Sequence, residues 1–64
     1  MSERIFTADE KHRAAMREVG YRKRVYIRLV DAQKMTQKQA NEQIAVMEQI
    51  AADYQKQAES ERLL

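Results

Sequence analysis

The stretch TQKQANEQIAVMEQIAADYQKQA, residues 36 to 58, carries the clearest periodic pattern in the chain. Its apolar residues follow one another at alternating steps of four and three, the spacing of a seam along which one helix packs against another. The seam consists of Ala40, Ile44, Met47, Ala51, Tyr54 and Ala58. Thr36 followed by Gln39 matches a capping box, in which the two side chains bind free backbone N–H groups of the first turn. The stretch therefore predicts a helix over about residues 37 to 60.

A second capping box, Thr7 with Glu10, predicts an earlier helix over about residues 8 to 31. The connecting segment DAQKM, residues 31 to 35, is so short that the two helices must be antiparallel neighbours. It lacks the glycine that commonly follows a helix, so we expect Gln33 or Lys34 in the left-handed backbone conformation. The predicted fold class is all-α, an antiparallel two-helix hairpin that forms one domain over residues 1 to 64.

The earlier helix has an apolar side that we expect to be buried, because its members share one broad arc at 100° per residue. They are Ala8, Ala15, Met16, Val19, Tyr26 and Val30. Val25 and Leu29 extend this surface, and Val46 and Ile50 extend the seam of the later helix. The apolar surface is therefore wider than one partner helix would cover.

A chain of 64 residues has a marginal core on its own, since folding at this size buries only about 60 % of the surface of the unfolded chain. It has no cysteine for a disulfide, and one histidine without a thiol cannot form a structural zinc site. We therefore expect a homodimer or higher oligomer, most simply a four-helix bundle dimer. The residues expected in its core or interface are Val19, Val25, Tyr26, Leu29, Val30, Ile44, Met47, Ile50 and Tyr54.

Positive charge is concentrated in the first half of the chain. The net charge is +2, but residues 1 to 34 hold nine Lys or Arg against five acids (+4), and residues 35 to 64 hold three against five (−2). Four arginines of the earlier helix fall within about 60° of one another, with a tyrosine at the edge. We call this set the basic strip: Arg13, Arg17, Tyr21, Arg24 and Arg28. The planar guanidinium suits two-point binding of carboxylate or phosphate, so the strip is a candidate partner-binding surface.

Three interpretations of the basic strip remain open. Acids such as Glu48 or Glu59 could neutralise it within the hairpin or within a larger oligomer. An acidic surface of another protein could bind it, with Tyr21 as an aromatic anchor. In the third interpretation a symmetric dimer sets two strips side by side and binds the phosphates of nucleic acid, or of another phosphorylated ligand, without reading bases. The modest net charge and the lack of a short recognition helix weigh against nucleic acid.

No residue pattern in the chain points to catalysis. His12 is the only histidine and lies on the side expected to be buried, and there is no cysteine or Gly-rich phosphate loop. The Glu-x-x-His motif of di-iron bundles does not occur, so we expect no enzyme activity, no metal and no cofactor. The longest apolar run, IAVM, is far shorter than the roughly eighteen residues that span a bilayer, and no apolar signal segment follows the N-terminus. We expect a cytoplasmic protein without a membrane partner.

Two blocks, MREVGYRKRVYIRLV at 16 to 30 and KMTQKQANEQIAVMEQIAADY at 34 to 54, cover somewhat more than half the chain. In them the chain resembles short helical hairpin proteins of unassigned function that bacteriophages and prophages encode. It departs from that pattern at Gln33, where a glycine is expected. The resemblance implies a small accessory protein in the host-cell cytoplasm that binds a host protein and inhibits or modulates it. It transfers no catalytic or binding residue to this chain.

Overall fold

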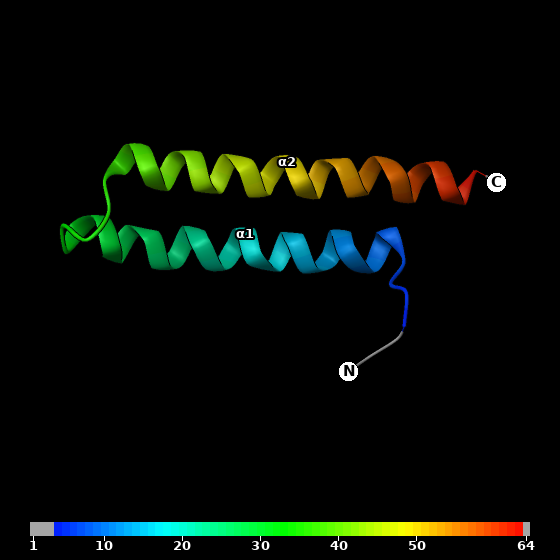
Figure 1. The fold of residues 1–64 in the computed structure, drawn as a ribbon, viewed down its shortest axis with the longest axis horizontal. Helices are drawn as coiled ribbons and strands as arrows, with labels where there is room; N and C mark the ends of the chain where they lie inside the picture. Colours follow the sequence, from blue (N-terminus) through cyan, green and yellow to red (C-terminus); the bar gives the residue numbers. More distant parts are fainter. Residues whose placement is uncertain (1–3, 64) are drawn as a thin grey trace.

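The computed structural model describes residues 4 to 63 and contains two helices, α1 (Ala8–Asp31) and α2 (Gln37–Arg62). The helices run antiparallel and pack side by side along their length, joined by one tight turn (Figure 1). The described part of the chain has no strand, so the predicted all-α hairpin is confirmed. The Cα atoms span only 13 Å in the shortest direction, which means that the hairpin is a single layer of helices.

Both helices begin with a complete capping box. The Thr7 hydroxyl accepts from the Glu10 backbone N–H at 3.1 Å, and the Glu10 carboxylate accepts from the Thr7 N–H at 3.1 Å. The corresponding distances for Thr36 and Gln39 are 3.1 and 3.0 Å. Hydrogen bonding from the Thr7 backbone lowers the pKa of the Glu10 carboxyl, with smaller contributions in the same direction from the Thr7 hydroxyl and Arg4. Two free N–H groups at each helix start are thus satisfied by side chains, as the sequence predicts.

The turn ends α1 without a glycine. The Gln33 N–H donates to the Val30 carbonyl at 3.0 Å, and the Lys34 N–H reaches back to the Leu29 carbonyl at 2.8 Å. This pair of bonds is the Schellman motif, which needs a left-handed residue at its centre. Gln33 adopts that conformation with φ of 60°, so it is Gln33 and not Lys34 that occupies the strained position.

Replacing Gln33 with glycine is expected to raise the free energy of unfolding by about 0.5 to 1 kcal/mol. The left-handed conformation costs an L-residue about 1 to 2 kcal/mol, and the extra entropy of unfolded glycine offsets part of that gain. Urea titration followed by circular dichroism measures the change, with Gln33→Ala as the control because alanine keeps the Cβ. Equal stability of the two variants would contradict the assigned turn.

The contact between the helices is built mainly from alanine. The buried residues are Ala8, Ala15, Val19, Ala40, Ala51 and Ala58. Small side chains let the two backbones approach closely, but they bury little apolar area, and no large side chain in the described residues is fully buried. Of the residues predicted for the core or interface, Val19 is buried, while Ile50 is exposed at 37 %. The others are half-buried: Val25, Tyr26, Leu29, Val30, Ile44, Met47 and Tyr54.

The prediction that Met16 lies on the buried side of α1 is wrong. Met16 is 50 % exposed, because the close contact between the helices covers only a narrow line and Met16 lies beside it. A contact made by small side chains therefore buries a narrower arc than the sequence pattern suggests.

Polar contacts cross from one helix to the other along the hairpin. His12 Nδ1 lies 2.9 Å from the carbonyl oxygen of Ala51, and since a carbonyl only accepts, Nδ1 must carry the proton. Arg22 Nη1 donates to the Gln43 carbonyl at 2.7 Å, and its Nε pairs with Glu18 at 2.9 Å. Near the open end, Arg62 pairs with Asp9 at 3.0 Å. Arg62 is also the last residue of α2, which ends two residues beyond the predicted end. These contacts hold the hairpin together where its apolar core is thin.

Candidate binding surfaces

The basic strip lies on the outer side of α1. Ala15 and Val19 face α2, and the strip is centred about 180° around the helix from them. All five strip residues are exposed, and Tyr21 keeps 52 % of its surface accessible. From Arg13 to Arg28 the strip extends about 22 Å at 1.5 Å per residue. The chain therefore presents this basic surface to solvent, away from the helix contact.

Most of the strip has no acidic partner among the residues that the structure describes. Arg13 pairs with Asp9 at 3.1 Å, but Arg17, Arg24 and Arg28 make no ion pair or hydrogen bond to residues 4 to 63. The two acids considered as partners are engaged elsewhere, because Glu48 pairs with Lys23 at 3.6 Å and Glu59 accepts from Gln55 at 3.4 Å. Neutralisation within one hairpin is thus limited to the N-terminal end of the strip.

Gly20 lies beside the strip, where the backbone of α1 is open. A Cβ at this position would meet only Arg24 Nη1, at 3.8 Å, which is ordinary contact. No close approach within the hairpin requires glycine here. Its presence leaves a gap in the surface over which the Arg24 guanidinium lies.

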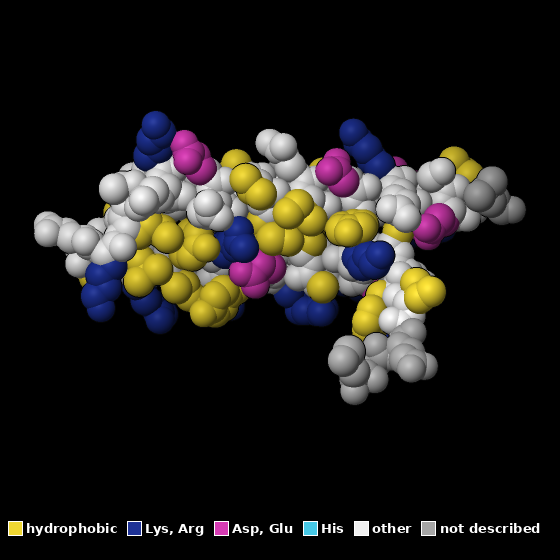
Figure 2. Space-filling model, viewed as in Figure 1, with side chains coloured by type: hydrophobic (Ala, Val, Ile, Leu, Met, Phe, Trp, Pro, Cys, Tyr) yellow, Lys and Arg dark blue, Asp and Glu magenta, His cyan; other side chains and the backbone are white. Residues whose placement is uncertain are grey.

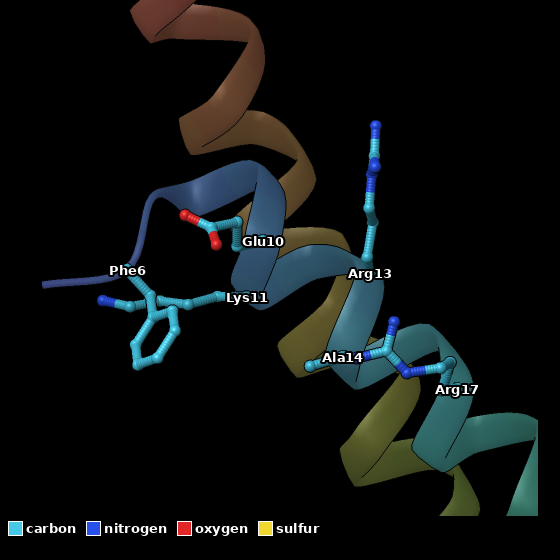
Figure 3. A pocket seen from close by; sticks show the side chains of 6 residues that line it. All are labelled: Phe6, Glu10, Lys11, Arg13, Ala14 and Arg17. Carbon is cyan, nitrogen blue, oxygen red and sulfur yellow. The ribbon is translucent and has the colours of Figure 1, made fainter. Parts of the chain in front are cut away.

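A hollow of about 400 Å³ opens at the N-terminal end of the strip (Figure 3). Its lining residues are Phe6, Glu10, Lys11, Arg13, Ala14 and Arg17. Phe6 projects from the segment before α1, while the remaining side chains come from the first turns of that helix. Two strip arginines therefore line the same hollow as an aromatic ring and an alanine, which gives this end of the strip both charge and apolar surface.

Phe6 was missing from the sequence prediction, although a signal for it exists. It directly precedes the cap Thr7, where an apolar residue commonly packs on the fourth helical residue as a hydrophobic staple. That position holds Lys11, whose ammonium lies 5.5 Å from the ring centroid of Tyr54. Without an apolar staple partner, Phe6 stays 47 % exposed, and the Arg4 guanidinium lies 4.9 Å from its ring centroid. An N-terminal aromatic with no staple partner was the available clue.

A second candidate surface is apolar and spans both helices. Val25 and Leu29 come three and seven residues after Arg22, and Val46 and Ile50 come three and seven residues after Gln43. Since Arg22 and Gln43 meet on one side of the hairpin, all four apolar residues lie on that side. We call these four residues the side face. Figure 2 shows hydrophobic side chains gathered over both helices on one side of the molecule, with a basic and an acidic side chain among them.

The single histidine of the chain is engaged between the helices. His12 is the only histidine, it is half-buried, and its Nδ1 is held by the Ala51 carbonyl. Among residues 4 to 63, no three His, Cys, Asp or Glu side chains are grouped so that they could hold a metal ion. Over the same residues, neither helix has a stretch long and apolar enough to cross a membrane.

The candidate surfaces are thus the basic strip with its adjoining hollow, and the side face. Comparison with protein-family models, curated proteins and solved structures finds no match to this chain.

Proposed function

We propose that this chain is a non-enzymatic binding protein whose basic strip docks on an acidic surface of another protein. The observation that carries the proposal is the row Arg17, Arg24 and Arg28, which point away from α2 and have no acidic partner among residues 4 to 63. Unpaired guanidiniums on one rigid helix are preorganised for two-point contacts with carboxylates. A protein partner with several carboxylates would supply the missing counter-charges.

The hollow beside Arg13 and Arg17 supports a protein partner in particular. Phe6 and Ala14 provide apolar surface in the hollow that Arg13 and Arg17 also line. Binding hot spots commonly combine arginine and aromatic residues around a site that excludes water. An apolar side chain of the partner, flanked by its carboxylates, fits this combination.

The partner that we propose is a host-cell protein. The resemblance to small phage accessory proteins motivates this choice, because such proteins commonly act by binding a host protein and inhibiting or modulating it. The chain would then work in the cytoplasm of the host cell. Blocking requires no catalytic residue, which agrees with a surface built for contact.

Self-association is the second part of the proposal. The buried set consists of five alanines and one valine, while Val46 of the side face is 51 % exposed. A second copy covering the side face would add the apolar burial that a small single-layer hairpin lacks. We infer a homodimer with four helices.

Nucleic acid is the second candidate ligand, and Tyr21 is the observation that favours it. This ring is 52 % exposed and lies between Arg17 and Arg24 along the helix. An exposed aromatic among cations can stack on a base while the cations contact phosphates. The same surface would then bind single strands without sequence preference.

Charge reversal of the strip is expected to abolish partner binding and leave the helices intact. The test variant is Arg17→Glu/Arg24→Glu, because neither side chain makes an ion pair or hydrogen bond to residues 4 to 63. The matched control is Lys38→Glu/Lys56→Glu, which makes the same charge change at exposed positions on α2. Each purified protein is used to capture partners from a bacterial lysate with and without nuclease treatment, and circular dichroism reports helix content.

Capture of one stoichiometric protein by the wild type and the control, but not by the strip variant, supports docking on a protein. Recovery of nucleic acid alone, lost with nuclease, supports the second candidate. In that case the binding constant should fall with salt with a log-log slope of about −0.7 for each phosphate contacted on a single strand. Loss of helix content in the strip variant alone would show that the strip is structural and would overturn both candidates.

A further inference from the structure

Two contacts on the side of the hairpin that includes the side face show which residues of α1 and α2 lie at the same position along the hairpin axis. Arg22 Nη1 meets the Gln43 carbonyl at 2.7 Å, and the Lys11 ammonium lies 5.5 Å from the Tyr54 ring centroid. Each pair joins one residue of α1 to the residue of α2 beside it. Because the helices are antiparallel, moving toward the turn along α1 corresponds to moving backward along α2.

This matching places the two halves of the side face at different levels. Val25 and Leu29 lie between the Arg22–Gln43 contact and the turn, whereas Val46 and Ile50 lie beyond that contact toward the open end. Along the hairpin axis the two pairs are separated by about ten residues, or about 15 Å at 1.5 Å per residue. Figure 2 shows the same oblique course, with hydrophobic side chains on α1 near the turn and on α2 farther along. The side face is therefore an oblique band.

A second copy of this chain is the occupant that fits the band. Two crossed hairpins, each about two helix diameters wide, can cover about 500 Å² of each other, which is below the roughly 800 Å² per partner of a standard interface and in the range of weak complexes. The charged groups beside the middle of the band include Glu18 and Arg22, which form an ion pair at 2.9 Å so that their charges cancel. Because like charges that face each other weaken a contact, this internal pairing favours the approach of two copies over the band.

Two copies cannot cover their bands if their helices are aligned. A two-fold axis parallel to the helices would stack α1 on the partner's α2 at the same level, where α2 carries Gln39 and Gln43 opposite Val25. An axis across both helices would stack each helix on its own reversed copy. No single position of that axis along the hairpin covers both halves of the side face, because the halves are about 15 Å apart.

We propose that two hairpins cross face to face about a two-fold axis that runs along the oblique band, so that Val25 and Ile50 each lie next to the same residue of the second copy. This arrangement rests on the self-association proposed above. Rotation about an axis along the band places the surface on one side of the band against the surface on the other side of the band in the second copy. Glu18, on one flank, then meets the side of the partner that carries Gln39 and Gln43, and like charges are kept apart.

Crossing has a consequence for the basic strips. Each strip points away from the α2 of its own hairpin, in the plane of the layer, so face-to-face stacking leaves both strips accessible. Because the hairpins cross, the strips run in different directions. The dimer offers two separate docking surfaces, and the side-by-side strips expected for phosphate binding do not form.

Single-cysteine variants test this arrangement, since the native chain has no cysteine. Val25→Cys and Ile50→Cys are each expected to form a disulfide-linked dimer under mild oxidation, because both positions lie near their own copies across the axis. The matched control is Ile27→Cys, an exposed apolar position on another side of α1 that should remain unlinked. Light scattering of the unmodified protein should give twice 7.6 kDa.

A second variant gives an independent readout. Ile50→Lys is expected to halve the mass, while Ile27→Lys leaves it unchanged. A monomeric wild type would overturn the dimer without touching the strip, whose binding is measured separately with the arginine variants. A dimer in which Val25→Cys links only when mixed with Gln39→Cys would show an aligned bundle and overturn the crossed arrangement. A dimer that keeps its mass with Ile50→Lys would exclude the side face as its interface.

Discussion

Replacing Ala51 with leucine is expected to lower the free energy of unfolding by about 3 kcal/mol. Ala51 is only 1 % exposed and its carbonyl oxygen lies 2.9 Å from His12 Nδ1, so the helices are in close contact here. A leucine side chain would force them apart, and overpacking of this kind costs about 1 to 3 kcal/mol. The separation would also break the His12 hydrogen bond, at about 1 kcal/mol more. The total is a large share of the roughly 3 to 10 kcal/mol typical of a chain this size.

Ala52→Leu is the matched control, because the adjacent alanine is exposed and leucine is nearly as good a helix former. Urea titration at one protein concentration, followed by circular dichroism, compares the two variants. Equal stability would mean that the helices are not held together at Ala51. Light scattering on both proteins shows whether the change also alters self-association.

The helix ends could be predicted from the sequence because they depend on local chemistry. Thr7 and Thr36 bind backbone groups only three residues away, so the residues that start each helix are visible in the chain itself. The turn was equally local, and its strained position fell to Gln33, one of two candidates. The choice between Gln33 and Lys34 depended on how far α1 continues, which the capping signals at the other end do not determine.

The sequence pattern predicted which positions of α2 face the other helix, but not how wide an arc of each helix is buried. The four-three spacing correctly selected Ala40, Ala51 and Ala58 as contact residues of α2. The exposure of Met16 depends instead on the distance between the helix axes, which the alanines set. A periodic pattern contains the direction of each side chain, but not the depth of the contact.

The candidate binding surface was predictable only where it follows one helix. Positions on a single helix share a side by geometry alone, so the strip could be listed from sequence. The hollow at its end requires Phe6, which lies outside α1 and is positioned by the path of the chain before Thr7. Contacts between a helix and an irregular segment have no period, so the sequence pattern could not show them.

Replacing Arg22 with methionine is expected to lower the free energy of unfolding by about 2 kcal/mol. Arg22 links the two helices by donating to the Gln43 carbonyl at 2.7 Å, and its Nε pairs with Glu18 of the same helix at 2.9 Å. A hydrogen bond to a charged group contributes about 1.5 to 3 kcal/mol, and the remaining 21 % exposure of the side chain favours the lower part of that range. Methionine keeps a long apolar side chain, so the loss reports the polar contacts.

Arg28→Met is the matched control, since Arg28 is exposed on the same helix and has no ion pair or hydrogen bond within residues 4 to 63. Its stability should stay within about 0.5 kcal/mol of the wild type, as for most surface changes. The two variants also separate the two roles of arginine in α1, because Arg22→Met should weaken the hairpin and spare partner capture, whereas Arg28→Met should weaken capture and spare the hairpin. If Arg28→Met destabilised the chain as much as Arg22→Met, the strip would be part of the fold, and a free docking surface on α1 would have to be abandoned.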